Sequence, residues 1–275
     1  MSAPASRAAM DRHAYLARIG QSAPAAGAAP SRALLRALHQ AHLLSVPFEN
    51  LSIHYGQPIA LEDAALYDKI VTRRRGGFCY ELNGLFAWLL RGLGYEVSLL
   101  SAEVARDAGG FGAPFDHLTL RVHGLAGADW LADVGFGDSF WQPLRLALDV
   151  EQDDADGRRY RLRAAGATHP GDGAEYWLLE QETDGADGGR WEPQYRFTLA
   201  PHALADYTDR CHYHQTSPDS SFTRKRVCTL ARPAGRDTLS ELTLIETRHG
   251  ARGERVLPSE DAYRAELAAR FGIVI

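Results

Sequence analysis

A change of hydrophobic period near residue 95 is the feature that most constrains how this chain can fold. Before it, apolar residues recur at helical spacing, as in the stripe Leu34, Leu35, Leu38 and Leu43 that follows Ser31. This is the pattern of an amphipathic helix. After it, short β-rich segments alternate with glycine-containing turns, which is the pattern of strands. The chain therefore predicts an α+β fold in which a helical part precedes a β-rich part.

The helical part ends where Gly92 and Gly94 follow the apolar stripe of its last helix. Four helices are predicted, over residues 10–19, 32–44, 61–71 and 79–91. Between the second and the third lies "SVPFENLSIHYGQP", which is rich in turn-forming residues and predicts a connector around Pro47.

The β-rich part predicts a small antiparallel sheet or barrel, because its segments are short and joined by turns. Its strands are expected over residues 97–104, 117–123, 130–136, 159–163, 176–181 and 191–199. The acidic stretch 149–158 is expected to be a surface loop, and "DGADGGR" at 184–190 a hairpin turn.

The remaining part mixes the two periods. It predicts a helix over 201–211, strands over 226–231 and 239–248, and a final helix that Ser259 caps and that ends near residue 271. We therefore divide the chain into a helical region at 1–95, a β-rich region at 96–200 and an α+β region at 201–275.

Charge and cysteine usage exclude several classes of protein. The formal net charge of −5 over 275 residues gives no reason to expect binding to nucleic acid or to an anionic membrane. Cys79, Cys211 and Cys228 are too few and too scattered for a disulfide framework, and the N-terminal segment lacks a continuous apolar run. A cytoplasmic protein is the expectation.

Cys79 stands in "RRRGGFCYELNG", where three arginines and two glycines precede it. The glycines allow a tight backbone approach, and Cys79 falls in the first turn of the predicted helix 79–91. A helix N-terminus and nearby arginines both stabilise a thiolate, so Cys79 is a candidate nucleophile. The alternative is a buried and inert cysteine. "CHYH" at 211–214 offers three possible metal ligands without a further pair, so no metal site is expected.

His117 and Asp133 are the candidates for the base and its partner. His117 opens the strand "HLTLRV", and Asp133 is the single carboxylate in the apolar segment "WLADVGFG". A buried carboxylate needs a partner, and a histidine would provide one; the alternative is a solvated edge position. The two residues share a face of an antiparallel pair if paired residue numbers add to an even value. His123 opposite Gly127 or opposite Asp129 meets this condition.

These motifs together resemble the arylamine N-acetyltransferases, in their bacterial-type form. The resemblance rests on "RGGFCYELNGLF" at 75–86, on His117 38 residues after Cys79, and on "DVGFG" at 133–137. It extends to "VPFENL" at 46–51, "SPDSSF" at 217–222 and "GRDTLS" at 235–240. The turn 124–129 is a residue longer than is usual in the family.

The resemblance implies a helical bundle, a central antiparallel β-barrel and a C-terminal α/β lid around a cysteine-protease-like core. The implied triad is Cys79, His117 and Asp133. Arg18, Glu49 and Arg74 match positions of an ionic network that supports the site, and Tyr213 and Ser221 match positions that contact CoA in some members. Acetyl-CoA is the implied co-substrate, with no permanently bound cofactor. The implied partners are small-molecule amines, for a monomer or homodimer with a role in xenobiotic metabolism.

The implied reaction is ping-pong acetyl transfer through an acetyl-cysteine to arylamines, arylhydrazines or heterocyclic amines. Phe48, Phe136 and Phe115 are candidates for an aromatic wall around the acceptor, with core packing as the alternative. Three rival functions stay open at this point. They are a macrolactam-forming amide synthase of the same fold, a cysteine-dependent thioester or amide hydrolase, and a non-catalytic binding module.

Overall fold

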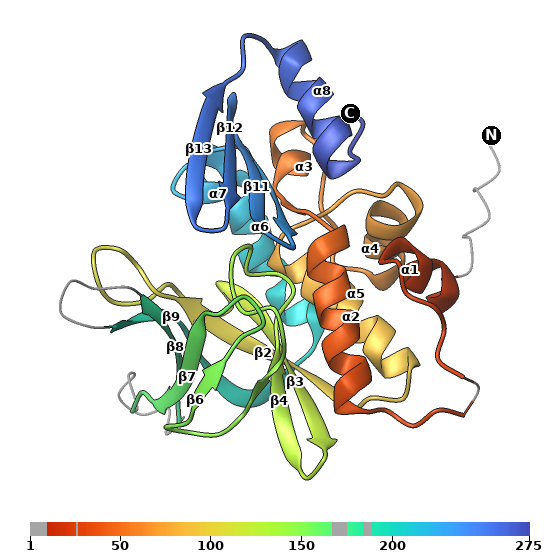
Figure 1. The fold of residues 1–275 in the computed structure, drawn as a ribbon, viewed down its shortest axis with the longest axis vertical. Coiled ribbons are helices and arrows are strands. Elements are labelled where there is room, and N and C mark those ends of the chain that lie inside the picture. The colour runs from red at the N-terminus through yellow and green to blue at the C-terminus, as the bar shows by residue number, and fades with distance from the viewer. Residues whose placement is uncertain (1–9, 26, 167–174, 184–188) are drawn as a thin grey trace.

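The structure is a computed structural model that describes residues 10–25, 27–166, 175–183 and 189–275. Figure 1 shows the N-terminal helices and the β-rich region beside each other, with the C-terminal sheet and its helix at the top of the view. The expected turn at 184–190 lies mostly outside the described residues. Within the described residues, no helix combines the length and the apolar character needed to cross a bilayer.

The four predicted helices of the first region are confirmed. The helices are α1 (Arg12–Arg18), α2 (Arg32–Ser45), α3 (Leu51–His54), α4 (Asp63–Tyr67), which continues in a π-helical turn (Asp68–Thr72), and α5 (Cys79–Gly92). Ser31 caps α2 as expected, because its Oγ accepts a hydrogen bond from the Leu34 N–H at 3.2 Å. The segment expected as a plain connector also contains α3 and a short strand, β1 (Phe48–Glu49).

The second region is a barrel-like antiparallel sheet of eight strands in the order β5-β4-β3-β2-β9-β8-β7-β6. The strands are β2 (Val97–Val104), β3 (His117–Leu125), β4 (Ala128–Ala132), β5 (Leu144–Arg145), β6 (Glu151–Asp153), β7 (Arg159–Ala164), β8 (Trp177–Thr183) and β9 (Arg190–His202). The six predicted strands are confirmed. Strand β6 lies in the stretch 149–158 that was expected as a loop, because it pairs with β7 at the sheet edge.

A second antiparallel sheet, in the order β1-β10-β11-β12-β13, joins β1 of the first region to four strands of the third. The third region also has helices before and after these four strands in the sequence. Its elements are a 3₁₀ turn (Leu204–Tyr207), α6 (Thr208–Thr216), α7 (Ser221–Arg224), β10 (Val227–Arg232), β11 (Gly235–Ser240), β12 (Thr243–Arg248), β13 (Ala251–Val256) and α8 (Glu260–Phe271). The strand predicted at 239–248 is two strands, since the chain reverses at Glu241 with a φ of 49°. The helix predicted at 201–211 begins later, because β9 extends to His202.

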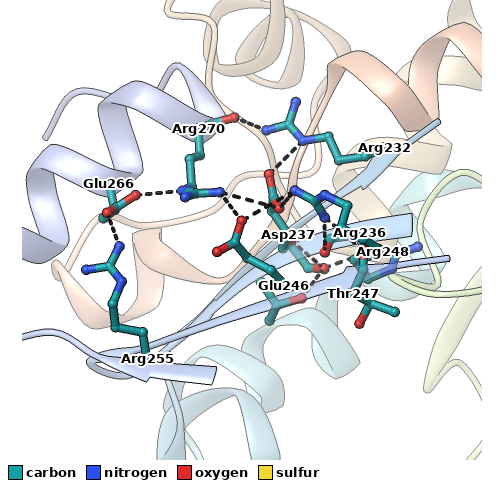
Figure 2. Close-up of polar contacts among 11 residues, drawn as sticks. Arg232, Arg236, Asp237, Glu246, Thr247, Arg248, Arg255, Glu266 and Arg270 are labelled. Atoms are coloured by element: carbon teal, nitrogen blue, oxygen red, sulfur yellow. Dashed lines mark hydrogen bonds and ion pairs between the residues drawn. The ribbon is translucent and has the colours of Figure 1, made fainter. Parts of the chain in front are cut away.

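An ionic network ties this sheet to α8 (Figure 2). The buried carboxylate of Asp237 on β11 accepts hydrogen bonds from Arg232, at 2.8 Å, and from Arg248 on β12. Arg270 on α8 lies 3.6 Å from the same carboxylate and donates to Glu246 at 2.8 Å. Burial alone would raise the pKa of Asp237, but the Arg248 and Arg232 guanidinium groups hold it below its ordinary value. The network therefore links four elements, β10, β11, β12 and α8, through charged side chains.

One hydrophobic core joins the first two regions. Helix α5 contributes Leu82, Leu85 and Phe86, and strand β3 contributes Leu118 and Leu120 to the same cluster. This packing places the N-terminus of α5 beside the start of β3 and the end of β4. The boundaries at residues 95 and 200 remain a prediction, since the helices and the sheet share this core.

Candidate active site

The backbone around Cys79 is held by an approach that only glycine permits. The Glu49 N–H donates to the Gly77 carbonyl at 2.8 Å, and the Gly77 N–H donates to the Pro47 carbonyl at 3.3 Å. A Cβ added at Gly76 would lie 2.0 Å from the Pro47 carbonyl oxygen. The tight approach expected for the two glycines is thus present, and it fixes the chain just before Cys79, the first residue of α5.

A buried ion pair holds the same helix N-terminus. The Glu81 carboxylate accepts the Phe78 N–H at 3.2 Å, as a capping residue in the first turn of α5. Lys69 on the π-helical turn donates to both oxygens of Glu81, at 2.7 and 3.0 Å. Both side chains are almost fully buried, so water could not solvate the charge of one partner if the other were removed.

His117 and Asp133 meet as the parity argument predicted. In the register of β3 and β4, Leu120 pairs with Ala132 and Val122 with Trp130, so the paired numbers add to an even value. Beyond Val122 the register shifts, because Leu125 pairs with Ala128, so His123 is paired with neither Gly127 nor Asp129 as expected. Asp133 lies one residue beyond the end of β4, which is shorter than expected. His117 Nε2 lies 2.6 Å from Asp133 Oδ2, and both side chains are buried.

Three further residues fix the Asp133 carboxylate. Asn83 Nδ2 donates to Oδ1 at 2.8 Å, the Gly135 N–H donates to Oδ1 at 3.0 Å, and the Tyr195 hydroxyl donates to Oδ2 at 3.0 Å. Burial alone would raise the pKa of Asp133, but the charge and hydrogen bond of His117, with the Asn83 and Gly135 donors, hold it below its ordinary value. Asp133 is therefore an anion that orients His117.

Sequence reasoning missed Asn83 and Tyr195. Asn83 carried a usable signal, because it is a polar residue one helical turn after Cys79 in an apolar helix. Its Oδ1 also accepts the Val134 N–H at 2.8 Å, so it ties α5 to the turn after β4. Tyr195 carried no local signal, since a tyrosine in a strand is ordinary.

Cys79 and His117 both line a cavity of about 210 Å³. Burial raises the pKa of the Cys79 thiol, and a hydrogen bond from the Leu118 backbone N–H opposes that effect without overcoming it. The sulfur therefore needs a proton acceptor in order to ionise. Within the lining of this cavity, His117 is the imidazole that Asp133 already orients. The remaining lining residues are Phe48, Val104, Asp116, Gly135, Phe136, His214, Ser221 and Phe222.

Two of the three expected wall residues line this cavity. Phe48 and Phe136 do so, and the Phe136 ring meets His117 edge-on with ring centroids 5.2 Å apart. Phe115 does not line it; its ring packs against Tyr207 and His202 instead, with centroids 5.1 and 4.8 Å away. Phe115 lies in the turn before β3 and has a φ of 62°.

The two expected CoA contacts differ in position. Ser221 lines the cavity and is exposed at its edge. Tyr213 does not line it, and its ring instead lies under the Arg210 guanidinium, 4.1 Å from the ring centroid. Phe222, next to Ser221, is an aromatic wall residue that sequence reasoning missed.

The expected support network of Arg18, Glu49 and Arg74 is formed differently. Glu49 is buried and pairs with Arg75, whose Nη2 lies 2.9 Å from it. The Arg74 side chain is exposed, because a φ of 53° at this residue turns the chain. Arg18 donates to the carbonyls of Ser45, Ile70 and Arg74, at 2.7, 3.1 and 3.3 Å. Arg75 thus takes the place expected for Arg74.

A larger cavity, of about 570 Å³, lies elsewhere, between the segment 138–158 and the strands β11 and β12. Its arginines, Arg158 and Arg236, both donate to Asp138, at 2.9 and 3.0 Å. It contains neither Cys79 nor His117, so its size does not make it the reaction site. In the described part of the chain, no group of three or more His, Cys, Asp or Glu side chains is arranged to hold a metal ion.

Comparison with known proteins agrees with this geometry. The sequence profile of a family described as N-acetyltransferase matches residues 33–275. The arylamine N-acetyltransferase, pineal gland isozyme NAT-10, of Gallus gallus is 36% identical over 228 residues, which cover 77% of this chain and 75% of the relative. Among solved structures, the arylamine N-acetyltransferase of Nocardia farcinica has a TM-score of 0.83 at 36% identity and covers 98% of this chain and 92% of that one. The enzyme of Salmonella typhimurium has a TM-score of 0.84 at 28% identity, with 95% and 90% covered.

Proposed function

The chain belongs to the arylamine N-acetyltransferase family, and we propose that it transfers an acetyl group from acetyl-CoA to aromatic amines and hydrazines through acetyl-Cys79. The protein is thus an acyl-transferring enzyme. The observation that carries the proposed mechanism is the cavity in which Cys79 and the Asp133-bound His117 face the same space. A buried thiol beside an oriented imidazole is suited to acyl transfer, because proton transfer to the imidazole makes the sulfur a nucleophile.

In the first half-reaction, the thiol proton of Cys79 moves to His117 and the sulfur attacks the carbonyl carbon of acetyl-CoA. The Glu81 and Leu82 N–H groups donate to the Phe78 carbonyl, which leaves the N–H groups of Cys79 and Tyr80 as the candidates to stabilise the oxyanion that forms. The bond from the carbonyl carbon to the CoA sulfur then breaks, and His117 returns the proton to that sulfur. The products are acetyl-Cys79 and free CoA.

In the second half-reaction, the amine nitrogen attacks the acetyl carbon while His117 takes a proton from the nitrogen. The bond to the Cys79 sulfur breaks, and the proton returns to the sulfur. The products are the N-acetylated amine and free Cys79. Asp133 stabilises the charged imidazole in both halves, since its carboxylate is anionic and directly hydrogen-bonded to the ring.

The acceptor ring would lie among Phe48, Phe136 and Phe222, which line the cavity beside Cys79. Offset or edge-on packing against aromatic side chains favours an aromatic acceptor over an aliphatic one. Ser221, exposed at the cavity edge, remains a candidate CoA contact, and Tyr213 a candidate by resemblance alone. The cytoplasmic location and the monomeric or homodimeric state also remain predictions.

The acetyl-enzyme is the species to test. Incubation with acetyl-CoA and no amine should release about one CoA per active site and then slow, since the intermediate lacks its acceptor. Intact mass should rise by one acetyl group, mapped to Cys79, and an aromatic amine or hydrazine should remove it. Cys79→Ser should show neither step.

Other outcomes would favour the rival functions. Sustained CoA release without an amine would indicate a thioester hydrolase. Product formation with no Cys79 adduct at any time would indicate direct transfer in a ternary complex. If no simple aromatic amine or hydrazine removes the acetyl group from the enzyme, the macrolactam-forming amide synthase becomes the favoured function.

A further inference from the structure

A second histidine–aspartate pair faces the cavity that contains Cys79. Asp116 directly precedes His117, and His214 lies on α6; both line the cavity. His214 Nε2 lies 3.2 Å from Asp116 Oδ1. Arg210, one turn before His214 on α6, donates to the same oxygen through Nε at 3.0 Å. The proposed mechanism uses none of these three side chains.

Hydrogen bonds tie His214 to the cavity wall. His214 Nδ1 lies 3.0 Å from Ser220 Oγ, and Ser220 Oγ accepts the Phe222 N–H at 3.2 Å. Among the described residues, His214 Nε2 makes no hydrogen bond although it lies 3.2 Å from Asp116 Oδ1, so the guanidinium of Arg210 is the group that donates to this carboxylate. The His214 ring also packs against the cavity wall at Phe222, with ring centroids 5.1 Å apart.

The carboxylate of Asp116 is the acidic group among the residues that line this cavity. Burial alone would raise the pKa of Asp116, but the adjacent His214 ring and the Arg210 guanidinium, which donates a hydrogen bond to this carboxylate, hold it below its ordinary value. Arg210 itself does not line the cavity. Asp133 adds a second negative charge behind His117. An acceptor in the cavity therefore meets an aromatic wall and a fixed anion, while the compensating cation lies outside.

We propose that Asp116, held by His214 and Arg210, makes the acceptor site selective for charge: it rejects arylamines that carry an anionic substituent and accepts neutral or cationic ones. This rests on the proposed function, because the cavity must be where the acceptor binds. An anionic substituent loses its hydration on entering a small aromatic cavity and gains a like charge as its neighbour. A neutral acceptor with an N–H or O–H donor instead gains a charged hydrogen-bond acceptor.

The test compares two acceptors with the same ring and amine, 4-aminobenzoate and its methyl ester. The ester group withdraws electrons more strongly than the carboxylate, so the nucleophilicity of the amine alone would favour the anion and cannot produce the expected preference for the ester. The wild-type kcat/KM for the ester should exceed that for the anion by about tenfold or more. Asp116→Asn should reduce this ratio about tenfold, because it removes the fixed anion and leaves Arg210 uncompensated. Arg210→Gln should increase the ratio, because it removes the compensating cation.

Controls separate this selectivity from general damage. His212→Gln, on the exposed face of α6, should leave the ratio unchanged. Acetyl-enzyme formation without an acceptor should be measured for every variant, so that a defect in the first half-reaction is seen separately. A wild-type enzyme that uses both acceptors equally, prefers the anion, or keeps its ratio in Asp116→Asn would overturn the inference. Failure to acetylate either acceptor, with no acetyl-enzyme, would instead overturn the proposed function.

Discussion

The Nε2 atom of His39 accepts a hydrogen bond from the backbone N–H of Asp133 at 3.1 Å, across 94 positions of sequence. The other ring nitrogen, Nδ1, donates to the Trp141 carbonyl at 3.0 Å. Burial lowers the pKa of His39 to about 4, so the ring is neutral near neutral pH. Helix α2 thus fixes the backbone that carries the candidate triad carboxylate, and it does so only while His39 is unprotonated.

This contact predicts a loss of stability in acid. The folded-state pKa of His39, about 4, lies below the ordinary value of 6.5, so between these values the unfolded chain binds the proton and the folded chain does not. The free energy of unfolding should fall as the pH drops from 7 to 4, by about 3 kcal/mol for this residue. The free energy of unfolding, measured with urea at pH 7 and pH 4.5, should change less between these two pH values in His39→Gln than in the wild type. The exposed control His212→Gln should show the same change as the wild type. An equal change of the unfolding free energy with pH in the wild type and in His39→Gln would contradict the prediction.

The three cysteines should differ in reactivity. Cys79 opens on the cavity beside His117, which can take its proton, so iodoacetamide should modify it first at pH 7.5. Cys211 and Cys228 are buried; burial raises the pKa of Cys211 to about 12 and that of Cys228 well above its ordinary value. Peptide mapping after timed alkylation gives the three rates. His117→Phe should slow the labelling of Cys79 and leave the other two rates unchanged. Equal labelling of all three thiols in the folded wild type would contradict the proposed proton transfer from Cys79 to His117.

Asp133→Asn should lower turnover by about two to four orders of magnitude. The amide can hold His117 in the wrong tautomer, and it lacks the charge that stabilises the protonated ring. It also changes the partners of Asn83 and Tyr195, so the thermal midpoint should be measured alongside kcat. A folded Asp133→Asn protein with near-normal kcat would remove Asp133 from the triad.

The buried pair of Lys69 and Glu81 should matter for stability. Lys69→Met leaves the Glu81 carboxylate buried without its cation, which should cost about 3–5 kcal/mol in the free energy of unfolding. Adding Glu81→Gln to that variant should recover part of the loss, as a double-mutant cycle measured by chemical denaturation would reveal. Lys225, the other lysine of the chain, is exposed, so Lys225→Met is the matched control and should change little. Equal effects of the two lysine substitutions would refute this assignment.

The sequence predicted most elements because helical and strand periods are local properties. Its errors lie where pairing across the chain decides the outcome. Strand β6 forms in an acidic segment because β7 pairs with it. Glu241 divides one expected strand into two by a left-handed turn. Strand β9 runs to His202 because β2 pairs with it as far as that residue. Pattern alone could not anticipate these partners.

In the candidate site, too, the sequence predicted the residues that stand in local motifs and missed those that only tertiary packing brings close. Family motifs and strand parity identified Cys79, His117 and Asp133, because each stands in a short segment whose residue types are unusual. The structure added His39 as a residue that positions the backbone of Asp133, a role that no motif in the sequence indicated. Arg74 was expected in the support network, yet its own backbone conformation turns it outward.

The order of helical and strand regions, the family and the three candidate catalytic residues could all be predicted from the amino-acid sequence, since each is a property of nearby positions or of motif order. The distant side chains that surround these three residues could be identified only in the folded chain. Asp116 and His214 are 98 positions apart in the chain, yet 3.2 Å separates Oδ1 of one from Nε2 of the other. Such pairs form because packing brings α6 against the start of β3, where the partly buried Asp116 carboxylate accepts a hydrogen bond from Arg210 and lies beside His214. Local propensity carries no information about that meeting.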